Sequence, residues 1–378
     1  MPLKVLFTAS TYSHIRNFHI PYLQWFRREG WEVHVACGGQ PMQLPYIDEV
    51  IDLPFKKSMR SPDNFAAARL LRRDIQEVGY DLVCTHTALA SFFTRLALLG
   101  LRNRPPLINM VHGYLFDADT AWHKRELLLW AERLMAPVTD LLLTMNQCDY
   151  EIATECHLGK RVLNVPGIGV DFSRIQPLAE PAKDAMREEW EIPKDSFVLI
   201  YPAEFSERKS QSVLIRAMAE LPDHVLLILA GDGALMDQCR TLAEHLRVEN
   251  RVIFPGYLHD MSPWYSIADA AVTASRSEGL PFNVMEAMYA GLPVVASAVK
   301  GHTDLIRDGE TGLLYPYGDA TACAAQIRAL LDSEPLRRSL AENARTNVMQ
   351  FSLEDVFPQV IQAYRTVMPA ETLVAGKY

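Results

Sequence analysis

The chain has 378 residues, of which 49% are hydrophobic and 22% are charged, and its formal net charge is −9. This length suits two folded domains, because single hydrophobic cores rarely grow beyond roughly 250–300 residues. The acidic balance excludes nucleic-acid binding as the main function, because neutralising phosphates requires a concentrated basic surface.

The cysteines and the N-terminus bear on the compartment. The six cysteines are scattered without a CxxC or CxxH pair, which predicts buried thiols in a reducing compartment rather than disulfides or a zinc site: Cys37, Cys84, Cys148, Cys156, Cys239 and Cys323. The start "MPLKVLFTAS" has a strand-like pattern and not that of a secretory signal. No stretch approaches the roughly 20 apolar residues of a membrane span. We therefore expect a cytoplasmic protein that at most rests on a membrane surface.

The first half of the chain alternates short apolar runs with amphipathic segments of helical length. In order they are "KVLFTA", "IPYLQWFRREG", "EVHVAC", a helix over 63–78, "DLVCTH", a helix over 88–99 and "LINMVHG". This βαβα alternation predicts a mostly parallel, doubly wound sheet.

The second half repeats the pattern. It runs through "SFVLIYPAE", "SVLIRAMAEL", "HVLLILAGDG", "ALMDQCRTLAEHL", "RVIFPGY", "AAVTAS", a helix over 283–290 and "PVVAS", and ends in helices near 320–330, 335–349 and 353–367. A stretch rich in Pro and Gly separates the halves and is typical of a linker. We predict an N-terminal domain over 1–165, a linker over 166–181, a second domain over 182–351, and a C-terminal helix and tail over 352–378 that lean back on the first domain.

Ligands of open parallel sheets bind beyond the carboxyl ends of the strands, so those positions are the candidate site residues. Gly231-Asp232-Gly233 follows one strand, but it lacks the third glycine of a dinucleotide fingerprint and favours a structural turn. Arg208 and Lys209 lie between a strand and a helix, where cations can meet an anionic ligand. An ordinary solvated loop is the alternative for this pair.

The stretch "RSEGLPFNVMEAMYAGLPVVAS" contains two carboxylates, Glu278 and Glu286. One interpretation is a capping box, in which Asn283 caps the helix and Glu286 satisfies a backbone N–H group. In the other, the amides at the helix start bind phosphate, Glu286 binds ribose hydroxyls and Glu278 binds a sugar. Two carboxylates also suit a glycosidase. The neighbouring lysine and a phosphate-binding helix start favour a nucleotide-sugar transferase instead.

At these residues the chain resembles the retaining glycosyltransferases of family 4, which have the GT-B fold, and in particular the subgroup that builds capsular and exopolysaccharide repeat units. The resemblance covers nearly the whole chain. It is carried by residues 4–37 and by "MVHGYLF", "TDLLLTMNQCDYEIA", "VPGIGVDFSRI", "EFSERKS", "AGDGALMD", "RVIFPGY" and "EGLPFNVMEAMYAGLPVVAS". The last motif, with its two glutamates, is the most specific.

The resemblance implies roles for individual residues. Lys209 would contact the diphosphate of a nucleotide-sugar donor, most often a UDP-sugar, and the amides around Phe282, Asn283 and Val284 would hold phosphate or sugar oxygens. Glu286 would bind ribose and Glu278 the donor sugar, His112 would support the transition state from the first domain, and Gly256 and Tyr257 would lie at the base. Transfer would proceed with retention to a polyprenyl-linked saccharide acceptor.

The chain departs from the family pattern at one position. Many members have an arginine where this chain has Glu204, and that arginine helps to clamp the diphosphate, so Arg208 is our candidate substitute. The resemblance implies neither a cofactor nor an essential metal. Asp117-Ala118-Asp119 spells DxD, which binds a metal in another glycosyltransferase fold. Its position in the first domain favours a loop or acceptor role over a metal site.

The acceptor side belongs to the first domain. Ser10, Thr11, His14 and Arg16 are candidate acceptor residues, although capping of a helix by Ser13 explains that stretch equally well. A basic and apolar surface could also rest on an anionic membrane; its members are Lys56, Lys57, Arg60, Arg69, Arg72, Arg73, Arg95, Arg102 and Arg104 with "SFFTRLALLGLRNR". A solvated helix face beside a buried helix is the alternative.

Two other functions suit the same architecture. A nucleotide-sugar 2-epimerase would convert the donor without any acceptor, and a non-catalytic nucleotide-sugar-binding protein would only bind it. Glu204 is the best argument for the non-catalytic reading.

Overall fold

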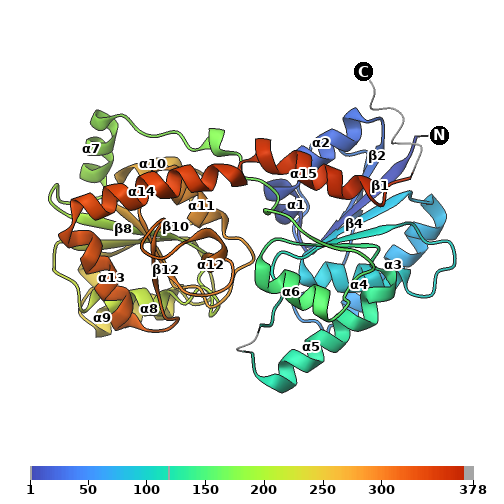
Figure 1. Cartoon of the computed structure of the whole chain (residues 1–378), viewed down its shortest axis with the longest axis horizontal. Coiled ribbons are helices and arrows are strands. Elements are labelled where there is room, and N and C mark those ends of the chain that lie inside the picture. Colours follow the sequence, from blue (N-terminus) through green and yellow to red (C-terminus); the bar gives the residue numbers. More distant parts are fainter. Residues whose placement is uncertain (1, 118–119, 370–378) are drawn as a thin grey trace. The chain divides into compact units, whose positions relative to one another are not determined.

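The computed structural model describes residues 2–117 and 120–369, and the chain folds as two compact units. Unit 1 contains the described residues up to Ile168 together with those from Val356 onward, and unit 2 runs from Gly169 to Asp355. Figure 1 shows that each unit has a central sheet with helices on both faces. The chain therefore crosses between the units twice.

Unit 1 is built on a parallel sheet of seven strands in the order β3-β2-β1-β4-β5-β6-β7. The bounds are β1 Lys4–Ala9, β2 Glu32–Cys37, β3 Glu49–Asp52, β4 Leu82–His86, β5 Leu107–Met110, β6 Leu141–Thr144 and β7 Val162–Asn164. β4, β5 and β6 are buried throughout, as expected for strands covered on both faces. The strand order reverses between β1 and β4, and this is the switch point of unit 1.

Helices cover both faces of this sheet (Figure 1). Their bounds are α1 Tyr12–Phe18, α2 Ile20–Arg28, α3 Pro62–Val78, α4 Ala88–Leu98, α5 Trp122–Met135, α6 Gln147–Glu155 and α15 Leu353–Arg365. The ring of Tyr22 in α2 packs against Phe357 and Tyr364 of α15, which ties the end of the described chain into unit 1. α3, α4 and α5 lie on the opposite face.

Unit 2 has a parallel sheet of six strands in the order β10-β9-β8-β11-β12-β13. The bounds are β8 Phe197–Pro202, β9 Val225–Ala230, β10 Val252–Gly256, β11 Ala270–Thr273, β12 Val294–Ser297 and β13 Leu313–Tyr315. Its helices are α7 Glu180–Glu189, α8 Gln211–Met218, α9 Met236–His245, α10 Ser262–Ile267, α11 Phe282–Tyr289, α12 His302–Leu305, α13 Ala320–Asp332 and α14 Glu334–Val348. The switch point of this sheet lies between β8 and β11.

The expected doubly wound sheets are both present, and most of the expected elements agree with the structure to within a few residues. Sequence reasoning missed several short or exposed elements, among them the edge strand β3, whose residues are mostly exposed. It also assigned the start of α7 to the linker, although Pro181 occupies the first turn of that helix, where proline is well tolerated. Four of the six cysteines are buried, and all six are free thiols.

Within the described ranges, no helix is both long enough and apolar enough to cross a lipid bilayer.

Candidate active site

The switch point of unit 2 brings together two loops that are distant in the sequence. Arg208 and Lys209 follow β8, whereas Glu278 follows β11. The loops are joined by a hydrogen bond from the backbone N–H of Arg276 to the carbonyl oxygen of Arg208, 2.8 Å long. The adjacent strands β8 and β11 thus deliver two cations and a carboxylate to one point.

Glu278 is the centre of this group. Its Oε1 accepts a hydrogen bond of 2.5 Å from Nζ of Lys209, and its Oε2 accepts one of 2.8 Å from Nη1 of Arg208. The side chains of Glu278 and Lys209 are only 8% and 12% exposed, whereas that of Arg208 is 47% exposed. Two cations around one carboxylate leave a net positive charge, which suits an anionic ligand.

Burial and ion pairing shift the pKa values of Glu278 and Lys209 in opposite directions. Burial alone would raise the pKa of Glu278, but Lys209, Arg208 and His302 hold it at about 2. Burial lowers the pKa of Lys209, and the neighbouring Glu278 carboxylate opposes that decrease. The carboxylate is therefore ionised throughout the physiological pH range.

Neighbouring residues position the ion pair. The hydroxyl of Tyr201 donates to the carbonyl oxygen of Lys209 over 3.1 Å and also contacts Oγ of Ser275, 2.8 Å away. Gly301 has a φ of +82°, and a Cβ atom there would lie 2.8 Å from Cβ of Glu278 and 2.7 Å from the carbonyl oxygen of Gly279. Only glycine permits this close approach without displacing the Glu278 loop.

The start of α11 does not form the expected capping box. The N-cap is Pro281, without a side-chain cap, and Asn283 instead donates from Nδ2 to the carbonyl oxygen of Pro202 over 2.9 Å. Oε2 of Glu286 accepts a hydrogen bond of 3.0 Å from the hydroxyl of Tyr265. The capping interpretation is therefore wrong, because tertiary contacts with β8 and α10 engage both side chains.

Glu286 is half-buried on α11. Burial raises its pKa, while the hydrogen bond from Tyr265 and the charge of Arg174 act in the opposite direction. Asn283 and Val284 belong to the first turn of the helix, where backbone N–H groups have no intrahelical acceptor. This helix start therefore has the features of an anion-binding end.

The other predicted residues of unit 2 lie on neighbouring loops. Gly256 ends β10 with a φ of +80°, and Tyr257 after it is 62% exposed. Glu204 is exposed in the loop after β8. Gly231 and Gly233 serve the tight turn after β9, because Cβ atoms there would lie 2.2 Å and 2.4 Å from the carbonyl oxygens of Ala203 and Phe205.

The predicted residues of unit 1 gather around its own switch point. The rings of His14 and His112 meet edge to face, with centroids 4.6 Å apart. Thr11, and not Ser13, caps α1, with its hydroxyl accepting from the backbone N–H of His14 over 3.3 Å. Ser10 contacts Oγ1 of Thr87 over 2.6 Å, and Arg16 is exposed.

Two expectations for unit 1 need separate mention. Asp117 exchanges hydrogen bonds with Thr120, its Oδ1 accepting from the Thr120 hydroxyl over 2.8 Å, whereas Asp119 lies outside the described residues. The segment "SFFTRLALLGLRNR" does not form an exposed apolar surface, because α4 is mostly buried. Arg95 is 1% exposed and forms a bidentate ion pair with Glu132, with distances of 2.8 Å and 3.0 Å.

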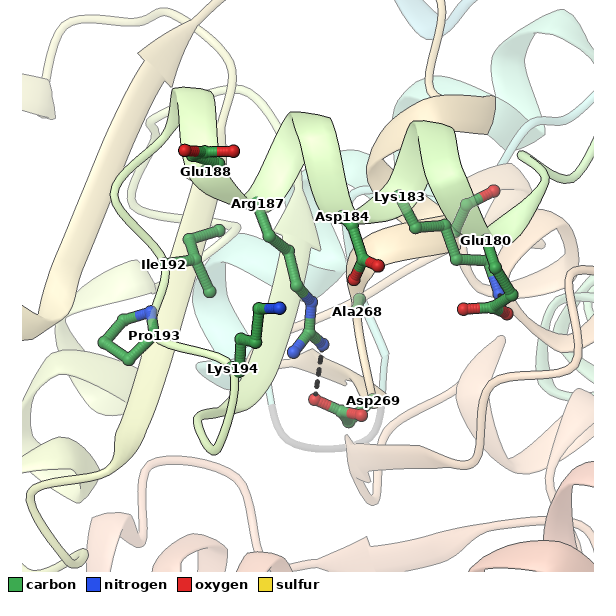
Figure 2. Close-up of a pocket in the computed structure, with 11 residues that line it drawn as sticks. Glu180, Lys183, Asp184, Arg187, Glu188, Ile192, Pro193, Lys194, Ala268 and Asp269 are labelled. Carbon is green, nitrogen blue, oxygen red and sulfur yellow. Dashed lines mark hydrogen bonds and ion pairs between the residues drawn. The ribbon is translucent and has the colours of Figure 1, made fainter.

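A surface pocket of about 640 Å³ in unit 2 is not this site. Figure 2 shows it beneath α7, with Arg187 paired to Asp269 over 3.1 Å. Asp269 precedes β11 and also accepts from the backbone N–H of Val198 at the start of β8. The pocket thus lies at the amino ends of the strands, opposite the edge where ligands of such sheets bind.

Sequence reasoning missed the residues that support the site from behind. Tyr265, Tyr201 and His302 are buried and read as ordinary core residues in the sequence. Only Gly301, in "KGHTD" directly after a strand, carried a signal of a special turn.

Comparisons with known proteins bear on the family of this chain. Residues 182–347 match the family model "Glycosyl transferases group 1", and residues 22–171 match "Glycosyltransferase Family 4". EpsD of Bacillus subtilis strain 168, which is named only provisionally as a glycosyltransferase, is 35% identical over 377 residues, covering 98% of this chain and 99% of EpsD. The chain belongs to the family 4 glycosyltransferases. It is therefore a transferase, which decides against the isomerase and the non-catalytic alternatives.

One further relative and one solved structure are similar to this family 4 glycosyltransferase. The Escherichia coli "UDP-Gal:alpha-D-GlcNAc-diphosphoundecaprenol alpha-1,3-galactosyltransferase" is 22% identical, covering 90% of this chain and 94% of that protein. The structure of Anabaena Alr3699/HepE in complex with UDP-glucose matches with a TM-score of 0.78 at 20% identity, covering 96% of this chain and all of that one. The expected GT-B fold is confirmed.

Proposed function

We propose that this glycosyltransferase moves a sugar, with retention of configuration, from a UDP-sugar to a lipid-linked or oligosaccharide acceptor during synthesis of a surface polysaccharide. The observation that carries the proposal is the group formed by Arg208, Lys209 and Glu278 at the switch point of unit 2. It combines a net positive charge with a buried carboxylate in the same unit as the α11 helix start.

The diphosphate is assigned to Lys209 and to the first-turn amides of residues 282–284. Because Arg208 already lies 2.8 Å from Glu278, it is placed to supply the second cation that the family pattern leaves open at Glu204. These groups stabilise charge on the departing diphosphate, which is usually the largest contribution to such catalysis.

The two carboxylates hold the two ends of the donor. Tyr265 occupies Oε2 of Glu286, so we assign the ribose hydroxyls to Oε1. Glu278 binds hydroxyls of the transferred sugar, and Tyr257 with Gly256 lies beside the base. An N-acetylhexosamine or a hexose fits this assignment, and uridine is favoured because HepE was solved with UDP-glucose.

The transfer step needs no nucleophile from the protein. The bond between C1 of the sugar and the diphosphate oxygen breaks, and the acceptor hydroxyl forms its bond to C1 on the same face. The acceptor proton passes to the departing phosphate oxygen. His112, whose pKa is held well below its usual value by burial and by nearby imidazoles, would act as a neutral hydrogen-bond partner of the sugar.

A polyprenyl-linked acceptor is proposed because the Escherichia coli relative is named for an undecaprenol-linked substrate. Membrane contact through α3 and α5 would bring the enzyme to such a substrate. The outer side of α5 exposes Trp122 by 78%, Leu127 by 63% and Trp130 by 62%. On α3 and the loop before it the exposed basic residues include Lys56, Lys57, Arg60, Arg69 and Arg73. Exposed indole rings and exposed cations are both typical of surfaces that rest on anionic lipids.

The decisive experiment incubates the purified chain with a panel of UDP-, GDP- and dTDP-sugars and short polyprenyl-diphosphate saccharides. We expect transfer from one UDP-sugar, with an α-linked product identified by NMR. Inversion of configuration, or transfer only from another nucleotide, would refute the corresponding part of the proposal.

Membrane contact is tested by co-sedimentation with liposomes that contain anionic lipid. The double change Trp122→Ser and Trp130→Ser should weaken binding, whereas Met349→Ser, at an exposed apolar residue of unit 2, should not. Equal binding of both variants would exclude the α5 surface.

A further inference from the structure

Four histidines of unit 1 form a cluster, and the proposed transfer uses only one of them. Each of His14, His19, His86 and His112 offers a ring nitrogen, and these four nitrogens lie within 4.8 Å of one another. His14 belongs to α1, His19 joins α1 to α2, His86 ends β4, and His112 follows β5. The cluster therefore lies at the carboxyl ends of neighbouring strands, where ligands of parallel sheets bind.

The spacing of the rings is close to that around a metal ion. Nε2 of His14 lies 3.2 Å from Nε2 of His19, and Nε2 of His112 lies 3.4 Å from Nδ1 of His86. Two imidazoles bound to tetrahedral zinc, with Zn–N near 2.0–2.1 Å, place their nitrogens about 3.3 Å apart and their ring centroids roughly 5 Å apart. Apart from the His19–His86 pair, the centroid separations in the cluster are 4.6–6.2 Å.

The His19 and His86 rings need the largest adjustment. Their centroids are 3.7 Å apart with an interplanar angle of 32°, so the rings are nearly stacked. A metal binds along a lone pair in the plane of the ring, and both rings would have to turn about χ2 to converge on one ion. This torsion is soft, because the terminal χ2 of histidine is broad rather than confined to narrow wells.

Two nitrogens of the cluster are unsatisfied. Nδ1 of His19 and Nε2 of His86 are buried, and neither has a hydrogen-bond partner among the described residues. A buried polar atom without a partner is uncommon and destabilises the fold. The short contacts above use the other nitrogen of each ring, so a bound ion satisfies these two atoms only if the rings turn about χ2.

The protonation state also suits a metal. Burial lowers the pKa of His14 to about 4. Burial, with repulsion from the neighbouring imidazoles, lowers the pKa of His19, His86 and His112 well below the usual value. The rings are then neutral at pH 7, which is the form that coordinates metals. A set of imidazoles without carboxylates favours zinc, copper, nickel or cobalt over magnesium or calcium.

We propose that His14, His19, His86 and His112 form a binding site for a divalent transition-metal ion, with zinc as the reference ion. His19 and His86 are fully buried, whereas His14 and His112 are partly exposed, so the ion enters from the side of the latter pair. A bound ion occupies His112 and withdraws it from the donor sugar. This inhibitory consequence rests on the proposed function, whereas binding itself does not.

The test uses the full chain after removal of metal with a chelator. Titration with Co²⁺ should produce the visible absorption of a four-coordinate ion at one equivalent, and Zn²⁺ should displace it. His19→Gln and His86→Gln should each weaken binding about tenfold or more. His123→Gln, at an exposed histidine of α5, is the matched control and should bind like the unchanged protein. If neither cluster variant weakens Co²⁺ binding, the ion binds elsewhere on the surface and the proposal is overturned.

X-ray absorption at the zinc edge keeps the proposal testable if the variants fail to fold. The unchanged protein loaded with one equivalent of Zn²⁺ should show scattering from at least three imidazoles. Fewer imidazoles, or no stoichiometric binding, would refute the site. Zinc that binds but leaves transfer unchanged would instead refute only the role of His112.

Discussion

Replacing Lys209 by methionine tests the buried ion pair of unit 2. The change removes the closest partner of Glu278, a side chain that is 8% exposed. The decrease in the pKa of Glu278 from 4.5 to about 2 corresponds to about 3 kcal/mol in favour of the ionised form. Lys209 makes the largest contribution to this decrease, and removal of one partner of a buried pair typically costs about 3–5 kcal/mol. Because Arg208 remains, we expect Lys209→Met to lower the free energy of unfolding by about 2–4 kcal/mol.

A double-mutant cycle separates this pairing from the loss of the lysine side chain. Glu278→Gln in the Lys209→Met background removes the carboxylate charge that has lost its lysine partner. The double variant should therefore regain about 2 kcal/mol of the free energy of unfolding. Lys183→Met is the matched control, because Lys183 pairs with Glu180 at 2.9 Å but their side chains are 30% and 81% exposed. Lys183→Met should lower the free energy of unfolding by less than about 1 kcal/mol.

The assay is urea denaturation of the full chain followed by circular dichroism, fitted with separate transitions for the two units because a two-state model is unsafe for such chains. If Lys209→Met lowers the free energy of unfolding no more than Lys183→Met does, Lys209 does not stabilise Glu278 as a buried partner. A double variant no more stable than Lys209→Met would contradict the pairing equally.

The remaining predictions concern the same unit. Gly301→Ala should displace the Glu278 loop and weaken UDP binding in calorimetry. Gly309→Ala is the control and should not weaken it, because Gly309 has a similar φ of +74° but no atoms close to the added Cβ. Equal affinities of the two variants would contradict the steric argument. Glu286→Gln should weaken UDP binding about tenfold, by about 1.4 kcal/mol, and Tyr265→Phe should weaken it less; unchanged affinity in Glu286→Gln would remove the ribose assignment. Because the folded-state pKa of Glu278 is lowered, its contribution to stability should be complete above pH 4.5 and lost as the pH falls towards 2. Comparing the unchanged protein with Glu278→Gln in denaturation at several pH values measures this difference, and a constant difference over that range would contradict it.

Much of the fold follows from periodicity in the sequence. Runs such as "HVLLILAGDG" predicted strands because parallel strands are buried on both faces and so read as continuous apolar segments. Periodicity did not reveal β3, an exposed edge strand, or α5, whose exposed residues include Trp122 and Trp130 among polar ones. Amphipathic patterns assume an outer face that is polar throughout, and the outer face of α5 mixes polar and large apolar residues.

The site could be predicted where it follows strand ends, and not where it depends on side chains behind them. Arg208 and Lys209 were expected in the loop after a strand and Glu278 in a loop before a helix, and the ion pairs between them are a finding of the structure. The capping interpretation of Glu286 failed because a local pattern carries no information about Tyr265, which reaches it from another helix.

The sequence alone determined the alternation of strands and helices, the doubly wound units and the loops that carry charged residues, because these depend on local periodicity and on short turns. The partners of the site side chains follow from the three-dimensional packing. The pairing of Lys209 with Glu278, and the meeting of His19 with His86, join residues far apart in the chain. Such contacts arise from the order of strands in a sheet, which is set by long-range packing and not by neighbouring residues.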